Sequence, residues 1–165
     1  MFAGFSAFTW FHTILSLMAI IAGFVVVRDL FASRTQRAWT GFFIAAAALT
    51  SATGFGFTAP VGPSHVVGIL SLVLLTGSSL ALYVFHLAGP WRWTYAITQT
   101  LAQFLLVFVL VAQGFKKVPA LAAIAPTQSE PPFAAAEGAV AAIFLALAVA
   151  AAMRFRPVTA GTTPA

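Results

Sequence analysis

The sequence predicts an all-α polytopic membrane protein, a bundle of five transmembrane helices with the N-terminus outside and the C-terminus in the cytoplasm. Of its 165 residues, 61% are hydrophobic and only 7% are charged, whereas a soluble domain carries about 25% charged residues. A water-facing surface cannot be built from this composition. A bilayer core needs about 20 apolar residues for each helical crossing, and five segments of the chain meet that requirement.

The first three predicted spans each end at residues that mark a membrane boundary or stop a helix. The first span, residues 8–27, ends at the charged side chain of Arg28. The second, 39–57, is followed by two prolines and a glycine, and the third, 65–87, by a Gly-Pro pair. Proline lacks the N–H that a helix interior needs, so these segments predict turns.

The last two spans flank the longest connection. The fourth span, 94–115, ends at two lysines that begin the connection 116–132, and the alanine-rich fifth span covers 133–153. The five spans form one domain, 1–156. The polar segment 157–165 is expected to be a disordered cytoplasmic tail.

Basic residues predict the orientation, because short cytoplasmic loops carry most of the Lys and Arg. The two lysines lie on one side of the predicted bundle, and all six arginines lie on the other. We therefore expect a multi-pass protein of the bacterial inner membrane, with its arginines inside. These are Arg28, Arg34, Arg37, Arg92, Arg154 and Arg156.

Charge and cysteine content exclude several functions. The net charge of +5 comes from residues between apolar spans, which favours contact with the lipid bilayer and its anionic headgroups and not with nucleic acid. No cysteine is present, so disulfides and thiolate metal sites are excluded. The chain has no Gly-rich phosphate loop and no nucleophile elbow, and we expect it not to be an enzyme.

Polar side chains inside the predicted spans mark the candidate site, because a polar group in hydrocarbon is costly unless it pairs or faces a cavity. Glu137 lies about 6 Å from the outer edge of the fifth span, at a rise of about 1.5 Å per residue. His12 lies at nearly the same depth in the first span, and we expect the two to pair. The other outer candidates are His65, Ser51, Thr53 and Gln113.

The fourth span adds a stripe of glutamines. Gln99, Gln103 and Gln113 lie within about 80° of one another on a helix that turns about 100° per residue. The stripe could line a cavity facing a quinone or another carbonyl-bearing lipid, or could only hydrogen-bond neighbouring helices. The other candidates could also have no ligand role. Glu137 also suits the positive end of a helix dipole, and histidines at the interface are ordinarily solvated.

Haem is a second possible cofactor. His12 and His65 both lie at the outer side and could supply the axial ligands of one b-type haem. His86 lies about 31 Å farther along the third span, on the opposite membrane face, and three histidines exclude a two-haem relay. The cofactors left open are a quinone or a single b-type haem.

The connection 116–132 is long for a compact bundle, and long connections are usually functional or disordered. We expect it to cap the outer cavity and to hold Gln128, Ser129 and Glu130 near His12 and Glu137. Its sequence Ala125-Pro126-Thr127-Gln128-Ser129-Glu130-Pro131-Pro132-Phe133, with Val118-Pro119-Ala120-Leu121 and Thr53-Gly54-Phe55, resembles small bacterial inner-membrane proteins. That family has no established activity, so the resemblance implies only the topology and an important outer loop.

The leading hypothesis is an integral inner-membrane protein that binds a lipophilic ligand, quinone or haem-like, in an outer-leaflet polar cavity. The alternative is a structural or assembly subunit whose alanine-rich fifth span packs against other membrane subunits. A second alternative is a small transporter or proton-coupled carrier, which needs a polar path through the inner half. The residues that could form this path are Gln99, Gln103, Thr76, Ser78 and Ser79.

Overall fold

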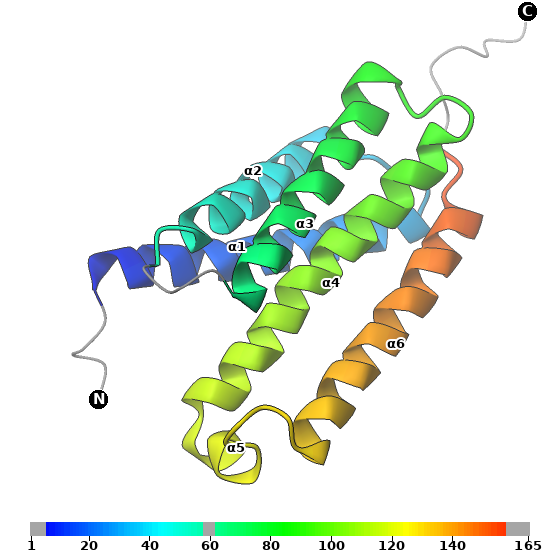
Figure 1. The fold of residues 1–165 in the computed structure, drawn as a ribbon. Helices are drawn as coiled ribbons and strands as arrows, with labels where there is room; N and C mark the ends of the chain where they lie inside the picture. The colour runs from blue at the N-terminus through cyan, green and yellow to red at the C-terminus, as the bar shows by residue number, and fades with distance from the viewer. Residues whose placement is uncertain (1–5, 58–61, 158–165) are drawn as a thin grey trace, which may run out of the picture.

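A computed structural model describes residues 6–57 and 62–157, which are all-helical and contain no strand. The predicted all-α class is confirmed, whereas the predicted tail lies outside the described residues from position 158 onward. Successive long helices run in alternating directions (Figure 1). In chain order the elements are α1 (Ala7–Phe31), α2 (Arg37–Gly54), α3 (Pro63–Ser79), the π-helical segment η1 (Leu80–Val84), α4 (Trp91–Lys117), α5 (Pro119–Ile124) and α6 (Pro131–Arg154).

The helix boundaries follow from local sequence. The Ser6 hydroxyl accepts a hydrogen bond from the Thr9 N–H at 3.2 Å and so caps α1, as serine commonly does. Proline opens α3, α5 and α6, at a position where its missing N–H has no helical partner in any case. Lys116 and Lys117 lie in the last turn of α4, where the negative end of the helix dipole favours them.

Within the part of the chain that the structure describes, four helices are long and apolar enough to cross a membrane, which indicates a multi-pass membrane protein. They are α1, the continuous α3–η1 segment, α4 and α6. The fifth long helix, α2, has only 18 residues. It is less apolar because it begins with Arg37 and contains several hydroxyl side chains.

The bundle is built around α4. This helix packs most extensively against α6 and also contacts α1 and α3, while α1 packs along α2. The far half of α4, with α5 and the first turns of α6, extends beyond α1–α3 (Figure 1). The central core combines small and large side chains from four helices, and small residues let helices approach closely. Its buried members are Ala19, Ile20, Ala22, Val26, Phe43, Ala46, Ala47, Leu75, Ala102 and Leu106.

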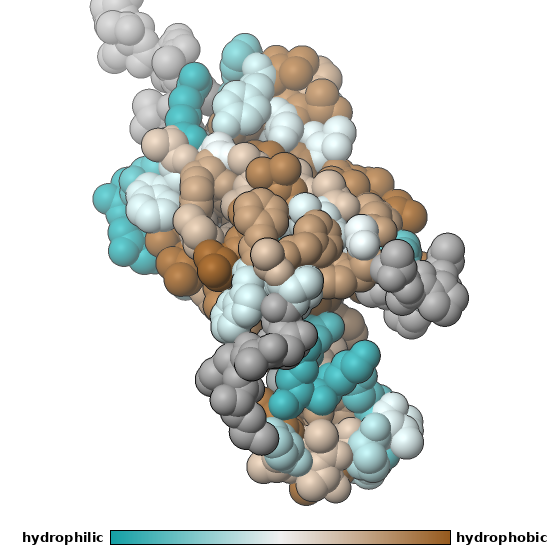
Figure 2. Space-filling view, turned by 90° about the vertical axis from the view of Figure 1, so that its left-hand side faces the viewer, coloured by the Kyte–Doolittle hydropathy of each residue, from teal (hydrophilic) through white to brown (hydrophobic). Residues whose placement is uncertain are grey.

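The molecular surface is strongly apolar. Large hydrophobic side chains are exposed on every long helix, among them Ile21, Leu49, Val73, Leu110 and Leu145. Figure 2 shows hydrophobic residues over the middle of the molecule and hydrophilic residues toward its upper left and lower part. An outward apolar face of this kind fits lipid contact, since a water-soluble protein rarely exposes large continuous apolar patches.

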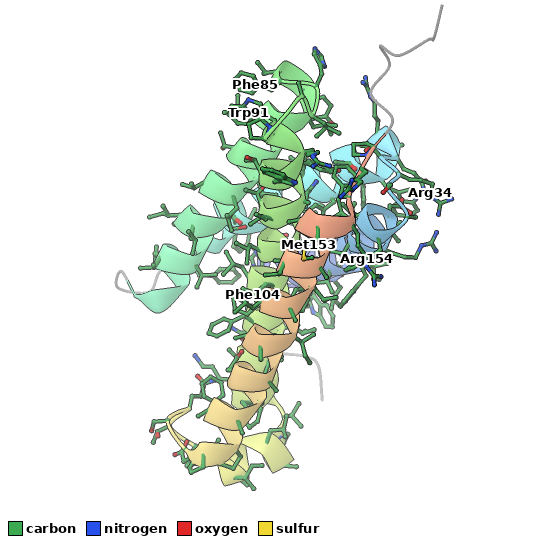
Figure 3. The ribbon with its side chains drawn as sticks, turned by 90° about the vertical axis from the view of Figure 1, so that its right-hand side faces the viewer. Arg34, Phe85, Trp91, Phe104, Met153 and Arg154 are labelled. Carbon is green, nitrogen blue, oxygen red and sulfur yellow. The ribbon has the colours of Figure 1, made fainter. Side chains whose placement is uncertain are left out.

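The two ends of the bundle differ in charge. At the end where α1 and α6 finish, called here the arginine end, the Ser33 hydroxyl donates to the Arg154 carbonyl at 3.0 Å. The Arg92 guanidinium donates to the Phe155 carbonyl at 3.4 Å. Arg34 and Arg154 lie on the same side of the molecule (Figure 3). The opposite end, where α4 finishes at Lys117, is the lysine end.

Candidate functional site

His12 is held at the lysine end by the last turn of α2. Its Nδ1 lies 2.8 Å from the Thr53 hydroxyl oxygen. That hydroxyl has one proton, which it donates to the Leu49 carbonyl at 2.7 Å or the Thr50 carbonyl at 3.2 Å. Thr53 is therefore the acceptor and His12 Nδ1 the donor, since a hydroxyl oxygen keeps two lone pairs. The neutral His12 ring then carries its free lone pair on Nε2.

Aromatic rings surround His12. The Phe57 ring lies edge-on to the imidazole, with centroids 5.0 Å apart, and contacts the Phe8 ring at 5.1 Å. Gly56 permits this contact, because a Cβ there would lie 2.9 Å from the Phe8 ring. The side of the imidazole is therefore apolar, and its polar contacts are confined to the ring nitrogens.

His65 lies at the start of α3 with the opposite hydrogen-bond arrangement. Its Nδ1 accepts a hydrogen bond from the Gly62 N–H at 3.3 Å. In the neutral ring the proton is therefore on Nε2. The His65 ring is 5.5 Å from the Phe55 ring, which in turn lies against Gly68, where a Cβ would be 3.2 Å from it.

Two small groups therefore flank the end of α2, His12 with Phe57 and Phe8 and His65 with Phe55; together they are called here the histidine–aromatic cluster (Phe8, His12, Phe55, Phe57 and His65). All three phenylalanine side chains are partly exposed. His12 presents an acceptor nitrogen and His65 a donor nitrogen. Such a pair can bind a ligand that has both a carbonyl and a hydroxyl group, with its apolar body on the rings.

The predicted glutamine stripe divides along α4. Gln103 is fully buried and its amide donates to the Ile20 carbonyl of α1 at 3.0 Å. Gln99 is also fully buried; its amide lies near the Tyr95 hydroxyl but makes no hydrogen bond of good geometry with the described residues. Gln113 is exposed, because this part of α4 extends beyond α1–α3. Ser51 is buried on α2.

Glu137 lies apart from these residues, between α6 and α4. The buried positions Glu137, Phe144 and Ala148 follow one face of α6, and the Phe144 ring meets Phe104 of α4 at 6.0 Å. Glu137 is 7% exposed, and its carboxylate oxygens have no hydrogen-bond partner among the described residues. His12 and Glu137 are therefore not hydrogen-bonded to each other, and α6 packs mainly against α4.

The loop before α6 is organised by its own side chains. Glu130 accepts hydrogen bonds from the Thr127 N–H at 3.1 Å, the Thr127 hydroxyl at 2.8 Å and the Ser129 N–H at 3.1 Å. Desolvation opposes ionisation, but these hydrogen bonds hold the pKa of Glu130 below its ordinary value. Gln128 donates to the Ala112 carbonyl of α4 at 2.7 Å. The conspicuous loop sequence therefore closes the α4–α6 hairpin.

Asp29 is a buried acid that the sequence pattern did not predict. Asp29 is 3% exposed and forms ion pairs with Arg28 at 3.7 Å and Arg34 at 3.6 Å. The buried Thr40–Tyr95 hydrogen bond, 3.1 Å long, lies at the same end. The available signal was an aspartate next to Arg28, at the end of the first predicted span.

Neither a metal site nor a related protein identifies the function. Within the described ranges, no three His, Asp or Glu side chains are grouped closely enough to hold a metal ion. Comparison of the chain with protein families, with curated proteins and with solved structures found no match. The function must therefore be argued from the geometry of the chain itself.

Proposed function

We propose that the chain crosses the bacterial inner membrane five times, with α2 as the additional span, its N-terminus outside and its C-terminus in the cytoplasm. The alternating direction of the long helices supports this arrangement (Figure 1). So does the gathering of arginines at one end of the bundle, because cytoplasmic loops carry the excess of basic residues. The histidine–aromatic cluster then lies at the outer leaflet.

We propose that the protein binds a lipophilic ligand of the quinone class at the histidine–aromatic cluster and is not itself an enzyme. The observation that carries this proposal is the opposite polarity of the two imidazoles. In the quinol form, one hydroxyl oxygen can accept from His65 Nε2–H while the other hydroxyl donates to His12 Nε2. The exposed phenylalanines suit the ring and the isoprenoid tail, since ligand sites combine apolar walls with a few polar groups.

A b-type haem remains the other ligand of this proposal. His12 Nε2 has the free lone pair that an axial ligand needs, whereas His65 Nε2 carries a proton in the arrangement described. Haem would therefore require His65 to release its hydrogen bond to Gly62. An absorption spectrum separates the two ligands, because bound haem gives a Soret band and a quinone does not.

The test is ligand analysis of the full chain purified gently from its own membrane, followed by titration of the stripped protein with a short-chain quinone. We expect a co-purifying quinone that is lost in His12→Ala and His65→Ala. His86→Ala is the matched control, because His86 is exposed and belongs to the arginine end. Retention of the quinone in both cluster variants would overturn the proposal.

A second candidate, an assembly subunit, is favoured by one feature of α6. This helix packs mainly against α4, and its other faces expose small and apolar residues such as Ala139, Ala142, Ile143 and Leu145. Such a face can pack closely against another membrane helix. Co-purification of a defined larger complex, disrupted by Ala142→Phe but not by His12→Ala, would support this function over ligand binding.

A further inference from the structure

A groove lies between α2 and α3–η1, away from the histidine–aromatic cluster. Its volume is about 360 Å³, and it is a shallow groove open to the outside of the bundle. The walls that matter here are Ile44 and Ala48 of α2, Leu75 and Thr76 of α3, and Leu80 and Tyr83 of η1. The groove opens on the apolar surface of the bundle, toward the arginine end of these helices.

The inner wall of the groove has no polar group that needs a partner from a ligand. The hydroxyls of Thr76 and Ser79 donate to the Leu72 and Leu75 carbonyls, each at 2.8 Å. These hydroxyls are therefore satisfied within their own helix, and they do not extend the buried glutamines into a polar path. A hydrocarbon chain can occupy such a wall without leaving a polar group unpaired.

The π-helical segment forms part of the groove wall. Leu80, Tyr83 and Val84 all come from η1 and all line the groove. A π-helical turn is rare and occurs frequently at functional sites. Tyr83 lies over α2 at a glycine, because a Cβ on Gly41 would be 3.6 Å from the tyrosine hydroxyl.

The helix that forms one wall of the groove begins with a cation, Arg37. Arg37, the first residue of α2, shares a helix face with Gly41, Ile44 and Ala48, since these positions are separated by four, three and four residues. From its first residue onward, this face of α2 therefore carries Arg37, then Gly41 beneath the Tyr83 hydroxyl, and then the apolar groove wall. Arg37 is exposed, and arginine is well suited to phosphate because its planar fork donates two parallel hydrogen bonds.

We propose that this groove binds an anionic phospholipid of the cytoplasmic leaflet, with one acyl chain along the α2 and α3–η1 walls and the phosphate at Arg37 and Tyr83. Charge complementarity selects the headgroup, and the length of apolar wall selects a lipid over a free phosphate. This site rests on the five-span orientation proposed above. It is independent of the histidine–aromatic cluster, because none of the residues that line the groove belongs to that cluster.

The test is native mass spectrometry of the delipidated full chain in detergent, titrated with phosphatidylglycerol or with phosphatidylcholine of the same acyl chains. We expect one preferred phosphatidylglycerol adduct. Arg37→Gln should weaken that adduct by about tenfold or more, the size of a lost hydrogen bond to a charged group. Arg156→Gln is the matched control, because it removes an exposed arginine from the same end without touching the groove.

The acyl site is tested separately by Ala48→Phe, which fills the groove, against Ala45→Phe, an exposed position on the same helix that does not line it. Only Ala48→Phe should reduce binding of both phospholipids. Equal losses in Arg37→Gln and Arg156→Gln would show general charge attraction and overturn the site. Since Arg37 is exposed, its variant keeps the test decisive even where Ala48→Phe fails to fold.

Discussion

The Gln103 side chain lies against the backbone of α1 at Gly23, where an added Cβ would be only 1.8 Å from the amide oxygen. The same amide donates to the Ile20 carbonyl. This contact is possible only because position 23 has no side chain. It fixes the separation of α1 and α4 in the middle of the bundle, where hydrocarbon surrounds the protein.

Gly23→Ala is therefore expected to destabilise the protein by about 1–3 kcal/mol, the usual cost of overpacking a core. The measurement is thermal unfolding in a fixed detergent. Gly138→Ala is the control, because a Cβ on Gly138 meets nothing within 4 Å, and it should leave stability unchanged or slightly raised. Equal effects of the two substitutions would contradict the packing described at Gly23.

Gln103→Ala should rescue part of the Gly23→Ala defect, because it removes the closest obstacle. The rescue is partial, since the same Cβ would also lie 2.7 Å from the Phe43 ring. Neighbouring residues are expected to give non-additive free energies of unfolding in a double-mutant cycle. Additive effects of the two substitutions would show that the glutamine is not the obstacle.

Thr53→Val is expected to change the tautomer of His12. The Thr53 oxygen accepts from Nδ1, and valine leaves this N–H without an acceptor. Nitrogen-15 NMR of the histidine rings in ligand-free protein should therefore lose one Nδ1–H tautomer signal. The His65 signal, set by Gly62, should not move. Quinone affinity should fall about tenfold, as expected for a misoriented hydrogen-bond partner.

Lowering the pH should loosen the loop between α5 and α6. The pKa of Glu130 is lower in the folded chain than its ordinary value, so the stabilisation is present above the unfolded pKa and is lost as the pH falls through the folded pKa. Hydrogen exchange at the Thr127 and Ser129 amides, corrected for intrinsic rates, should then increase. Glu130→Gln should show this increase already at neutral pH and remove most of its pH dependence.

The orientation can be tested cleanly, because the chain has no cysteine. Ala123→Cys on α5 and Ala32→Cys after α1 both introduce a thiol at an exposed alanine. A membrane-impermeant maleimide added to intact cells should label position 123 at once and position 32 only after permeabilisation. The reverse pattern would place the arginines outside and move the groove to the outer leaflet.

Much of the helical organisation could be predicted from the sequence, because prolines, glycines and charges interrupt an otherwise apolar chain. Predicted spans 94–115 and 133–153 lie inside α4 and α6, which extend one to three residues further at each end. The third span was predicted to continue to residue 87, but η1 ends at Val84. His86 and Leu87 then adopt positive φ angles of 48° and 60°. Local backbone hydrogen bonds close this turn, with the Leu87 N–H donating to the Ala81 carbonyl and the Ala88 N–H to the Phe85 carbonyl, each at 2.9 Å. Histidine and leucine rarely adopt positive φ, so these residue types do not predict it.

The candidate site was harder to predict, because similar depth in a membrane does not establish that two helices are neighbours. His12 and Glu137 were expected to pair at one depth, but His12 bonds Thr53 and Glu137 faces α4. The position of Thr53 near the end of the second span did predict that it lies with His12. The donor and acceptor roles of the imidazoles depend on contacts that only coordinates reveal.

The packing of α6 has a consequence for biogenesis. The buried residues of the central core come from α1, α2, α3 and α4, whereas α6 contributes Ala151 to a second core cluster at the arginine end. The helices made first can therefore settle around Gln103 and Gly23 while the ribosome is still translating the last span. We expect α6 to pack last against the assembled helices α1–α4. Its contact with α4 should form first next to the loop that Glu130 organises.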